Sequence, residues 1–144
     1  MRIQAISPEE TLEVRATVLR PGWAPMECLL SEDADPTSLH IGAINETGAM
    51  IGVASFYPVP LKSHTGNGFQ LRQMGVLPDY RRQGFASGIF REGIRLLKEQ
   101  AATYVWCNAR QVALPFYQAE GMEFISDVFE VPKIGPHRRM LLNL

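Results

Sequence analysis

Alternating and unbroken runs of apolar residues divide the chain into short segments typical of β-strands, separated by turn residues. Residues 2–6 alternate polar and apolar positions, as a half-buried strand does. Residues 39–44 and 49–56 are joined by Asn-Glu-Thr-Gly, a sequence typical of a hairpin turn. Four further strands are predicted at residues 69–76, 104–108, 124–131 and 138–142. The pattern therefore predicts about seven strands.

Helical periodicity fills the stretches between these strands. Residues 7–10 (Ser-Pro-Glu-Glu) have the composition of a capped helix start, and an Arg-Pro-Gly sequence ends that helix. The clearest apolar stripe runs over residues 85–97, with charged residues on the other side. We expect a short helix at residues 112–120 and a loop or short helix in the acidic stretch 23–37. The prediction is one domain, residues 1–144, with a mixed α/β (α+β) fold in which about four helices flank the sheet.

Composition and charge narrow the classes of function. A formal net charge of −1 disfavours a protein that coats nucleic acid or an anionic membrane surface. No apolar run approaches the ~20 residues needed to cross a membrane, and the N-terminus lacks the order of a signal peptide. Cys28 and Cys107 fit no metal-ligand spacing, so we expect two reduced thiols, no metal and a cytoplasmic protein. The sequence leaves open whether two copies form a homodimer.

One loop has the features of an anion-binding site. A predicted strand is followed by residues 81–86 (Arg-Arg-Gln-Gly-Phe-Ala), which open the strongest helix. A helix N-terminus presents unpaired N–H groups and about half a positive charge. Gly84 lets a pyrophosphate approach the backbone, Ala86 keeps the next position small, and Arg81 and Arg82 add positive charge at the rim. The loop matches neither a Walker A nor a Rossmann pattern, because it lacks their lysine and glycines.

Two segments together resemble the GNAT family of N-acetyltransferases. Residues 70–86 contain V-L-P-D-Y-R and R-R-Q-G-F-A, close to the family patterns V-x-P-x-Y-R and Q/R-x-x-G-x-G/A. Residues 113–122 are similar to the family's A-x-x-F-Y-x-x-x-G-F, with Met122 in place of phenylalanine. The terminal I-G-P-H-x-x-M and the W-C-N-A-R sequence also resemble uncharacterised bacterial GNAT proteins. The resemblance implies a GNAT fold, acetyl-CoA as acyl donor and transfer of acetyl to an amine.

The resemblance also implies where the donor binds. The sheet should open like a V between the strands at residues 69–76 and 104–108, with the pantetheine arm in the opening. Gly75 indicates a bulge, next to which the backbones of Met74 and Val76 would bond the pantetheine amides. The pyrophosphate would lie on amides at the start of the strongest helix, those of Gln83, Gly84, Phe85, Ala86 and Ser87.

Two residues, Asn108 and Arg110, are alternative candidates for a further contact with the cofactor. Family members often place an asparagine three residues before the alanine of the second motif. Arg110 holds that position here, and Asn108 lies two residues earlier. The resemblance does not decide which of the two contacts the cofactor.

Acetyl transfer from a thioester to an amine needs a proton donor and a neutral amine. By resemblance, Tyr117 has the position of the general acid that protonates the leaving thiolate. The central strand offers no carboxylate as a base, so His40 and His137 are candidates, and a structural role is the alternative for each. We expect the acceptor, a small molecule or peptide, between residues 20–40 and 134–140. Candidate acceptor contacts are Arg20, Glu27, His40 and His137.

Two alternatives belong with this interpretation. The acidic loop leaves a cationic polyamine or an aminoglycoside open as the acceptor. A non-catalytic acyl-CoA-binding regulatory module is the alternative function, and the presence of Tyr117 favours catalysis over it.

Overall fold

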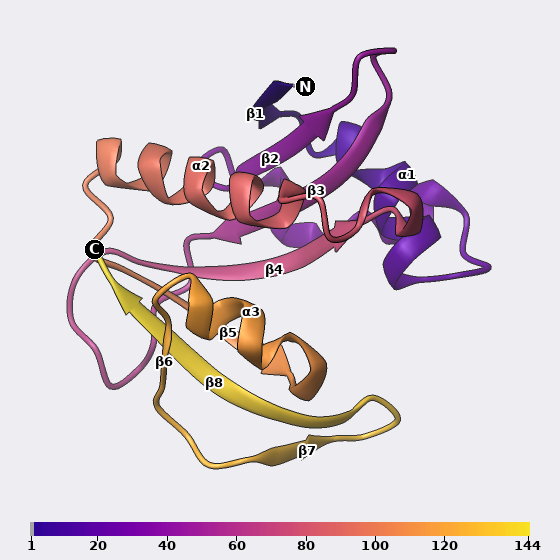
Figure 1. The fold of residues 1–144 in the computed structure, drawn as a ribbon. Coiled ribbons are helices and arrows are strands. Elements are labelled where there is room, and N and C mark those ends of the chain that lie inside the picture. Colours follow the sequence, from indigo (N-terminus) through magenta and orange to yellow (C-terminus); the bar gives the residue numbers. More distant parts are fainter. Residues whose placement is uncertain (1) are drawn as a thin grey trace.

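An eight-stranded sheet with the order β1-β2-β3-β4-β5-β8-β6, to which β7 adds beside β8, organises the computed structural model of residues 2–144 (Figure 1). Its strands are β1 Arg2–Ile6, β2 Leu39–Ile44, β3 Met50–Tyr57, β4 Gly68–Val76, β5 Tyr104–Arg110, β6 Glu123–Phe124, β7 Phe129–Val131 and β8 Gly135–Asn143. Its α-helices are α1 Leu12–Val14, α2 Phe85–Glu99 and α3 Leu114–Ala119. Within these residues, β4 and β5 form the one parallel pair, so the predicted mixed sheet is confirmed.

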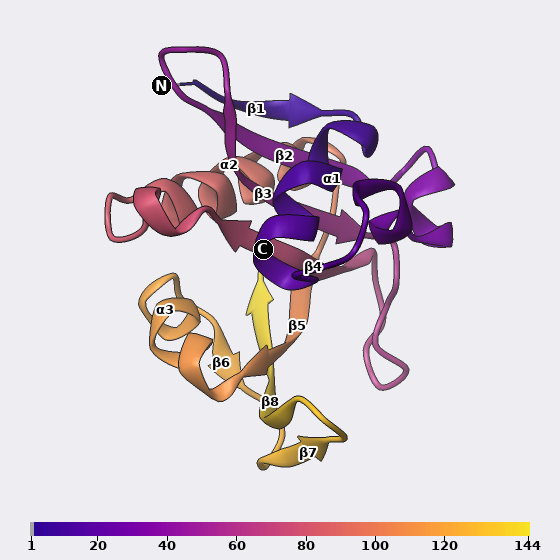
Figure 2. The same ribbon diagram turned by 90° about the vertical axis from the view of Figure 1, so that its right-hand side faces the viewer.

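The two longer helices lie on one face of the sheet. The apolar stripe of α2 packs on β1 to β4, and Gly93 lets the helix approach the ring of Phe56 closely. Helix α3 covers β5 and β8, where Tyr117 and Met122 join the same core. Figure 2 shows both helices on the same side of the strands. A hollow lined by residues of both helices lies between the two halves of the sheet.

The other face of β2 to β4 is covered by the N-terminal helical segment and the turns that follow it. Arg15 donates to both oxygens of Asp33 at 2.7 and 3.0 Å, and also to Ser55 at 3.0 Å and Tyr57 at 3.1 Å. The two charged side chains are 0% and 1% exposed. This buried ion pair fixes the acidic loop against the sheet, because a buried charge needs its partner in place.

The N-terminal helix starts as predicted but is irregular. Ser7 and Glu10 form the reciprocal bonds of a capping box, at 3.0 and 3.3 Å. The segment then passes from a 3-10 turn at Glu9–Thr11 through α1 to a π-helix at Arg15–Leu19, which the bond from the Arg20 amide to the Arg15 carbonyl closes. The predicted single helix is therefore three short helical pieces.

Other boundaries differ from the prediction near the C-terminus. The strand expected at residues 124–131 is two strands, β6 and β7, because the chain between them turns at Ser126. The hydroxyl of Ser126 accepts the amide of Arg139 at 2.8 Å, which ties this turn to β8. Strand β5 extends to Arg110, two residues beyond the prediction, and the acidic loop holds two 3-10 turns. The result is eight strands where about seven were expected.

Membrane-spanning helices and clusters of metal-binding side chains are both absent from residues 2–144. None of their helices is both long and apolar enough to cross a bilayer. Within the same range, no three histidine, cysteine or carboxylate side chains cluster as metal ligands would.

Candidate active site

The sheet opens between β4 and β5. The two strands pair only from Gly68 to Gln70 on β4, opposite Tyr104 to Trp106 on β5, and then separate (Figure 1). Beyond the last pair lies a cavity of about 440 Å³. It is lined by residues 70–74 of β4, residues 107–110 of β5, α3 and its preceding turn, the end of the N-terminal helical segment and the β7–β8 hairpin. The predicted V-shaped split is thus present.

The bulge in β4 lies two residues before the predicted position. Ser55 pairs with Arg72 and Val53 pairs with Gly75, so Gln73 and Met74 are left out of the ladder with β3. Gln73 has the left-handed backbone, at φ 58°. Gly75 is a paired residue instead, and its missing side chain makes room for Val18 of the N-terminal helical segment. The backbone groups that lack a β3 partner are therefore next to the cavity.

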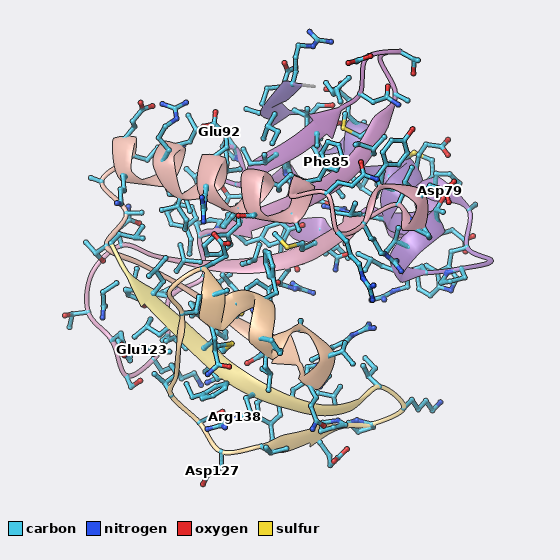
Figure 3. The ribbon with its side chains drawn as sticks, in the orientation of Figure 1. Asp79, Phe85, Glu92, Glu123, Asp127 and Arg138 are labelled. Carbon is cyan, nitrogen blue, oxygen red and sulfur yellow. The ribbon has the colours of Figure 1, made fainter. Side chains whose placement is uncertain are left out.

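A second hollow, of about 250 Å³, lies where α2 begins (Figure 3 labels Phe85 there and Asp79 in the turn before it). Its lining consists of the end of β4, the loop into α2 and the end of α3: Val76, Tyr80, Arg81, Arg82, Gly84, Phe85, Ala86, Ser87, Phe116 and Glu120. Gly84 has φ 85°, and a Cβ built on it meets nothing within 4 Å, so this side of the backbone is open. Residues 81–87, the predicted pyrophosphate cradle, thus share one concave surface except for Gln83, whose side-chain amide donates to the Asp79 carbonyl at 3.2 Å.

The start of α2 has the free donors that a phosphate needs. The first backbone bond of the helix runs from the Gly88 amide to the Gly84 carbonyl at 3.0 Å. Between residues 2 and 144, no acceptor bonds the amides of Phe85, Ala86 and Ser87. Three unpaired amides, the dipole of a 15-residue helix and two nearby arginines fit a pyrophosphate.

Glu120 is a residue of this hollow that the sequence interpretation missed. Its carboxylate accepts the Ser87 hydroxyl at 2.8 Å and the Arg91 Nε at 2.9 Å, and its side chain is 7% exposed. The bonds connect α2 to the end of α3, which sets the width of the hollow. The motif placed Glu120 beside the helix end, but only the packing of the helices brings it to Ser87.

Tyr117 lies in the wall of the larger cavity. Its hydroxyl reaches across the split and lies 3.7 Å from the Met74 sulfur, while its ring packs against Phe116 and Phe90. Burial raises the pKa of Tyr117 far above its ordinary value, and the nearby Cys107 adds to the shift. The phenol therefore stays protonated at neutral pH and has a proton to donate.

Cys107 also lies in this wall. Burial raises the pKa of the Cys107 thiol to about 12. The shift reflects the burial of this one side chain in the core, where a thiolate is poorly stabilised.

The two candidate histidines occupy different places. His137 lines the cavity opposite Arg110, and its Nδ1 lies 2.9 Å from the Gly135 carbonyl. His40 lines neither hollow and is buried under the N-terminal segment, with Nδ1 2.7 Å from the Ser55 hydroxyl. Burial and the neighbouring Arg15 lower the pKa of His40, although Asp33 opposes this, so His40 is neutral at pH 7. The structure separates His40 from the space in which an acceptor could lie.

Of the remaining predicted site residues, three line the cavity and Glu27 does not. Arg20, Asn108 and Arg110 line the cavity. Asn108 accepts Nε of Arg139 at 3.0 Å. Glu27 does not line it, because its carboxylate caps the Ala24 amide at 2.8 Å. The predicted acceptor region is thus only partly assembled, from Arg20 and His137 without Glu27 or His40.

Comparison with known proteins agrees with this geometry. Residues 7–122 match the Acetyltransferase (GNAT) family. The chain belongs to the GNAT acetyltransferase family. This GNAT protein is 33% identical over 146 residues to YitI, an uncharacterised N-acetyltransferase of Bacillus subtilis (strain 168), with 100% of the chain and 97% of YitI covered. It is accordingly an acetyl-CoA-dependent acetyltransferase.

Solved structures share the fold at low sequence identity. An aminoglycoside 6'-N-acetyltransferase complexed with coenzyme A superposes with a TM-score of 0.78 at 10% identity, covering 99% of the GNAT protein and 97% of that chain. ElaA of Escherichia coli superposes with a TM-score of 0.77 at 15% identity, covering 97% of each chain. At these identities the likeness concerns the fold.

Proposed function

We propose that this GNAT protein transfers the acetyl group of acetyl-CoA to a primary amine of a small molecule or peptide by direct attack, with Tyr117 as the general acid. The observation that carries the proposal is the protonated, buried Tyr117 in the wall of the split between β4 and β5. A phenol held in that state is a proton donor beside a cavity large enough for a thioester and a small amine.

The donor would span the two hollows. Residues adjacent in α3 line both of them, since Phe116 faces the cradle and Tyr117 faces the cavity. The amides of residues 85–87, with Arg81 and Arg82, would hold the pyrophosphate. The pantetheine arm would then follow β4 past its bulge, where backbone groups lack a β3 partner. The coenzyme A complex of the aminoglycoside acetyltransferase supports this use of the fold.

Direct attack forms one bond and breaks another. The amine nitrogen bonds to the thioester carbonyl carbon, the carbon–sulfur bond breaks, and the amine loses one proton. The thiolate takes a proton from Tyr117, and the proton that the amine loses passes to a base and through solvent restores the phenol. The products are the N-acetylated amine and free coenzyme A, with Tyr117 protonated again. Protonation matters here because coenzyme A leaves more readily as a thiol than as a thiolate. A backbone N–H beside Met74 would face the carbonyl oxygen as its charge grows.

His137 is the better-supported candidate for the base. The Gly135 carbonyl can only accept a hydrogen bond, so a neutral His137 carries its proton on Nδ1. This tautomer leaves a lone pair on Nε2 of a side chain that lines the cavity, which is the form that a base requires. His40 stays a weaker candidate because its ring is committed to the buried network.

The test is a measurement of coenzyme A release from acetyl-CoA over a panel of primary amines, with mass spectrometry of the products. The proposal predicts amine-dependent release and an acetyl group on nitrogen. Tight acetyl-CoA binding without turnover on any amine, peptides included, would instead favour the acyl-CoA-binding regulatory module. O-acetylated or hydrolysed products would contradict the proposal.

A further inference from the structure

The cavity beside Tyr117 is lined by basic side chains and lacks acidic ones. Its ionisable lining within residues 2–144, apart from Cys107 and Tyr117, consists of Arg20, Arg72, Arg110 and His137. No aspartate or glutamate of that range lines it. The acidic loop, which the sequence suggested as a contact for a cationic acceptor, reaches this wall through Glu32, which bonds to Arg72 at 2.8 Å. Asp33 pairs with Arg15, and Glu27 caps its own turn.

These arginines lie on the face of the sheet away from the pyrophosphate cradle. On β4, Arg72 is the strand partner of Ser55 on β3, and its guanidinium lies 5.7 Å from the ring centroid of Tyr57. Ser55 and Tyr57 both lie beneath the N-terminal segment, where they bond to Arg15. On β5, Arg110 alternates with Ala109, which packs in the core beneath α3. Since α2 and α3 cover the opposite face, the arginines face the side from which an acceptor would enter.

Two of the three guanidinium groups are available to a ligand. Arg72 is partly neutralised by Glu32 at 2.8 Å. Arg20 and Arg110 form no ion pair with any residue from 2 to 144. Arg20 donates only to the neighbouring Leu19 carbonyl and lies 5.6 Å from the ring centroid of Trp23.

Resting on the proposed N-acetyl transfer, we propose that the acceptor is an anionic amine: a small molecule that carries a carboxylate beside its amine, as an amino acid does. The planar fork of an arginine matches a carboxylate, with two parallel hydrogen bonds. A polyamine or an aminoglycoside would bring several positive charges next to Arg20 and Arg110, with no acid in the wall to offset them.

The same charges help the chemistry. Positive neighbours disfavour the ammonium form, so they lower the pKa of a bound amine and raise its neutral, nucleophilic fraction. Strand β4 offers no carboxylate that could take the proton directly. The carboxylate of the acceptor would thus bind the arginines, while its amine is held deprotonated toward the thioester.

Matched amine pairs test this proposal. Coenzyme A release is measured with a set of amino acids and the corresponding amino acid amides, together with spermidine and kanamycin. Conversion to the amide lowers the amine pKa, so unassisted chemistry favours the amide, and a preference for the acid must come from the protein. We expect kcat/KM to favour the acid by about tenfold or more, and the polycations to be the poorest acceptors.

Arg110→Gln shows whether the cavity causes the preference. We expect kcat/KM for the acid to fall about 10- to 100-fold and that for the amide to change little, because only the acid loses a charge-assisted hydrogen bond. Arg95→Gln is the charge-matched control, since Arg95 lies on the outer side of α2 and pairs with Glu92 and Glu99. If Arg110 instead binds a phosphate of the donor, the KM for acetyl-CoA rises and the acid-to-amide ratio stays constant, which would overturn the proposal.

A binding measurement separates this proposal from the proposed activity. Calorimetry compares N-acetyl amino acids with their amides on the protein saturated with coenzyme A. Tighter binding of the acids, lost in Arg110→Gln, supports the anionic site even if no amine is turned over. Equal binding of acids and amides, tighter binding of amides, or no binding of either rules out the anionic site, whatever activity is found.

Discussion

At the scale of single residues, the Arg15–Asp33 pair shows how strongly the fold controls protonation. Burial alone would raise the pKa of Asp33, but hydrogen bonds from Arg15, Tyr57 and the Leu30 amide outweigh it and bring the pKa to about 2. The carboxylate therefore stays ionised in the interior. It fixes the acidic loop through Arg15 and Tyr57, which also lies under Arg72 of the cavity wall.

This pair predicts a specific loss of stability in acid. The folded-state pKa of Asp33 lies below its ordinary value of 3.8, so the pair contributes about 2 kcal/mol above pH 4 and loses it as pH falls toward 2. Asp33→Asn should cost about 3–5 kcal/mol at pH 7, because Arg15 stays buried without its partner. Urea unfolding at pH 7, 5 and 3 measures both effects.

Glu46→Gln serves as the control, since Glu46 is an exposed carboxylate in a hairpin turn. It should unfold like the wild type at each pH. An Asp33→Asn protein as stable as the wild type at pH 7 would contradict the role of the pair.

Tyr117→Phe keeps the aromatic packing and removes the proton donor. General acids contribute about 10²- to 10⁴-fold, so kcat should fall within that range while affinity for acetyl-CoA is retained. Because burial raises the pKa of Tyr117, the wild type should show no alkaline loss of kcat from this group up to about pH 10. Steady-state rates from pH 6 to 10, with product release shown not to limit turnover, measure both. A variant with wild-type kcat would remove Tyr117 from the mechanism.

At the scale of elements, the sequence was most informative where local chemistry alone determines the structure. The strand–loop–helix unit from Gly68 to Glu99 was predicted closely, because its apolar stripe, its Pro78 turn and Gly84 all point to the same structure. The predicted position of the bulge in β4 is wrong. The sequence points to Gly75 because glycine is typical of bulges, whereas Gln73 is the residue that adopts the positive φ. That conformation depends on pairing with β3 and on the opening beside it, which no local pattern encodes.

The helix start at Gly84 can be tested as an element. Gly84→Glu would put a carboxylate at the three free amides, so acetyl-CoA binding should be lost while the far-UV spectrum is retained. Gly48→Glu is the matched control: Gly48 has φ 87°, open space around its Cα and a place in a hairpin turn. Calorimetry should show normal binding in this control. Equal affinities in the two variants would show that the pyrophosphate lies elsewhere.

At the scale of the whole molecule, the split joins two half-sheets through three residue pairs between β4 and β5. The resemblance to the family predicts this opening, and one of the two motifs lies on each side of it. These motifs did not predict the basic cavity, since Arg20, Arg72 and Arg110 come from three separate segments. These side chains line one cavity only because the strand residues alternate between the two faces and because β5 extends as far as Arg110. His40 is a candidate base by sequence, but the fold buries it on β2, two strands away from β4 at the split.

The most direct test of the central claim is a crystal structure of the protein with acetyl-CoA. We expect the pyrophosphate on the amides of Phe85, Ala86 and Ser87, and the pantetheine arm in the split. The thioester sulfur should lie within hydrogen-bond distance of the Tyr117 hydroxyl. The acetyl group should point toward the basic face, with Arg110 and His137 beyond it. A sulfur atom remote from Tyr117 would rule out this tyrosine as the general acid, and an arm that runs outside the split would rule out the proposed donor site.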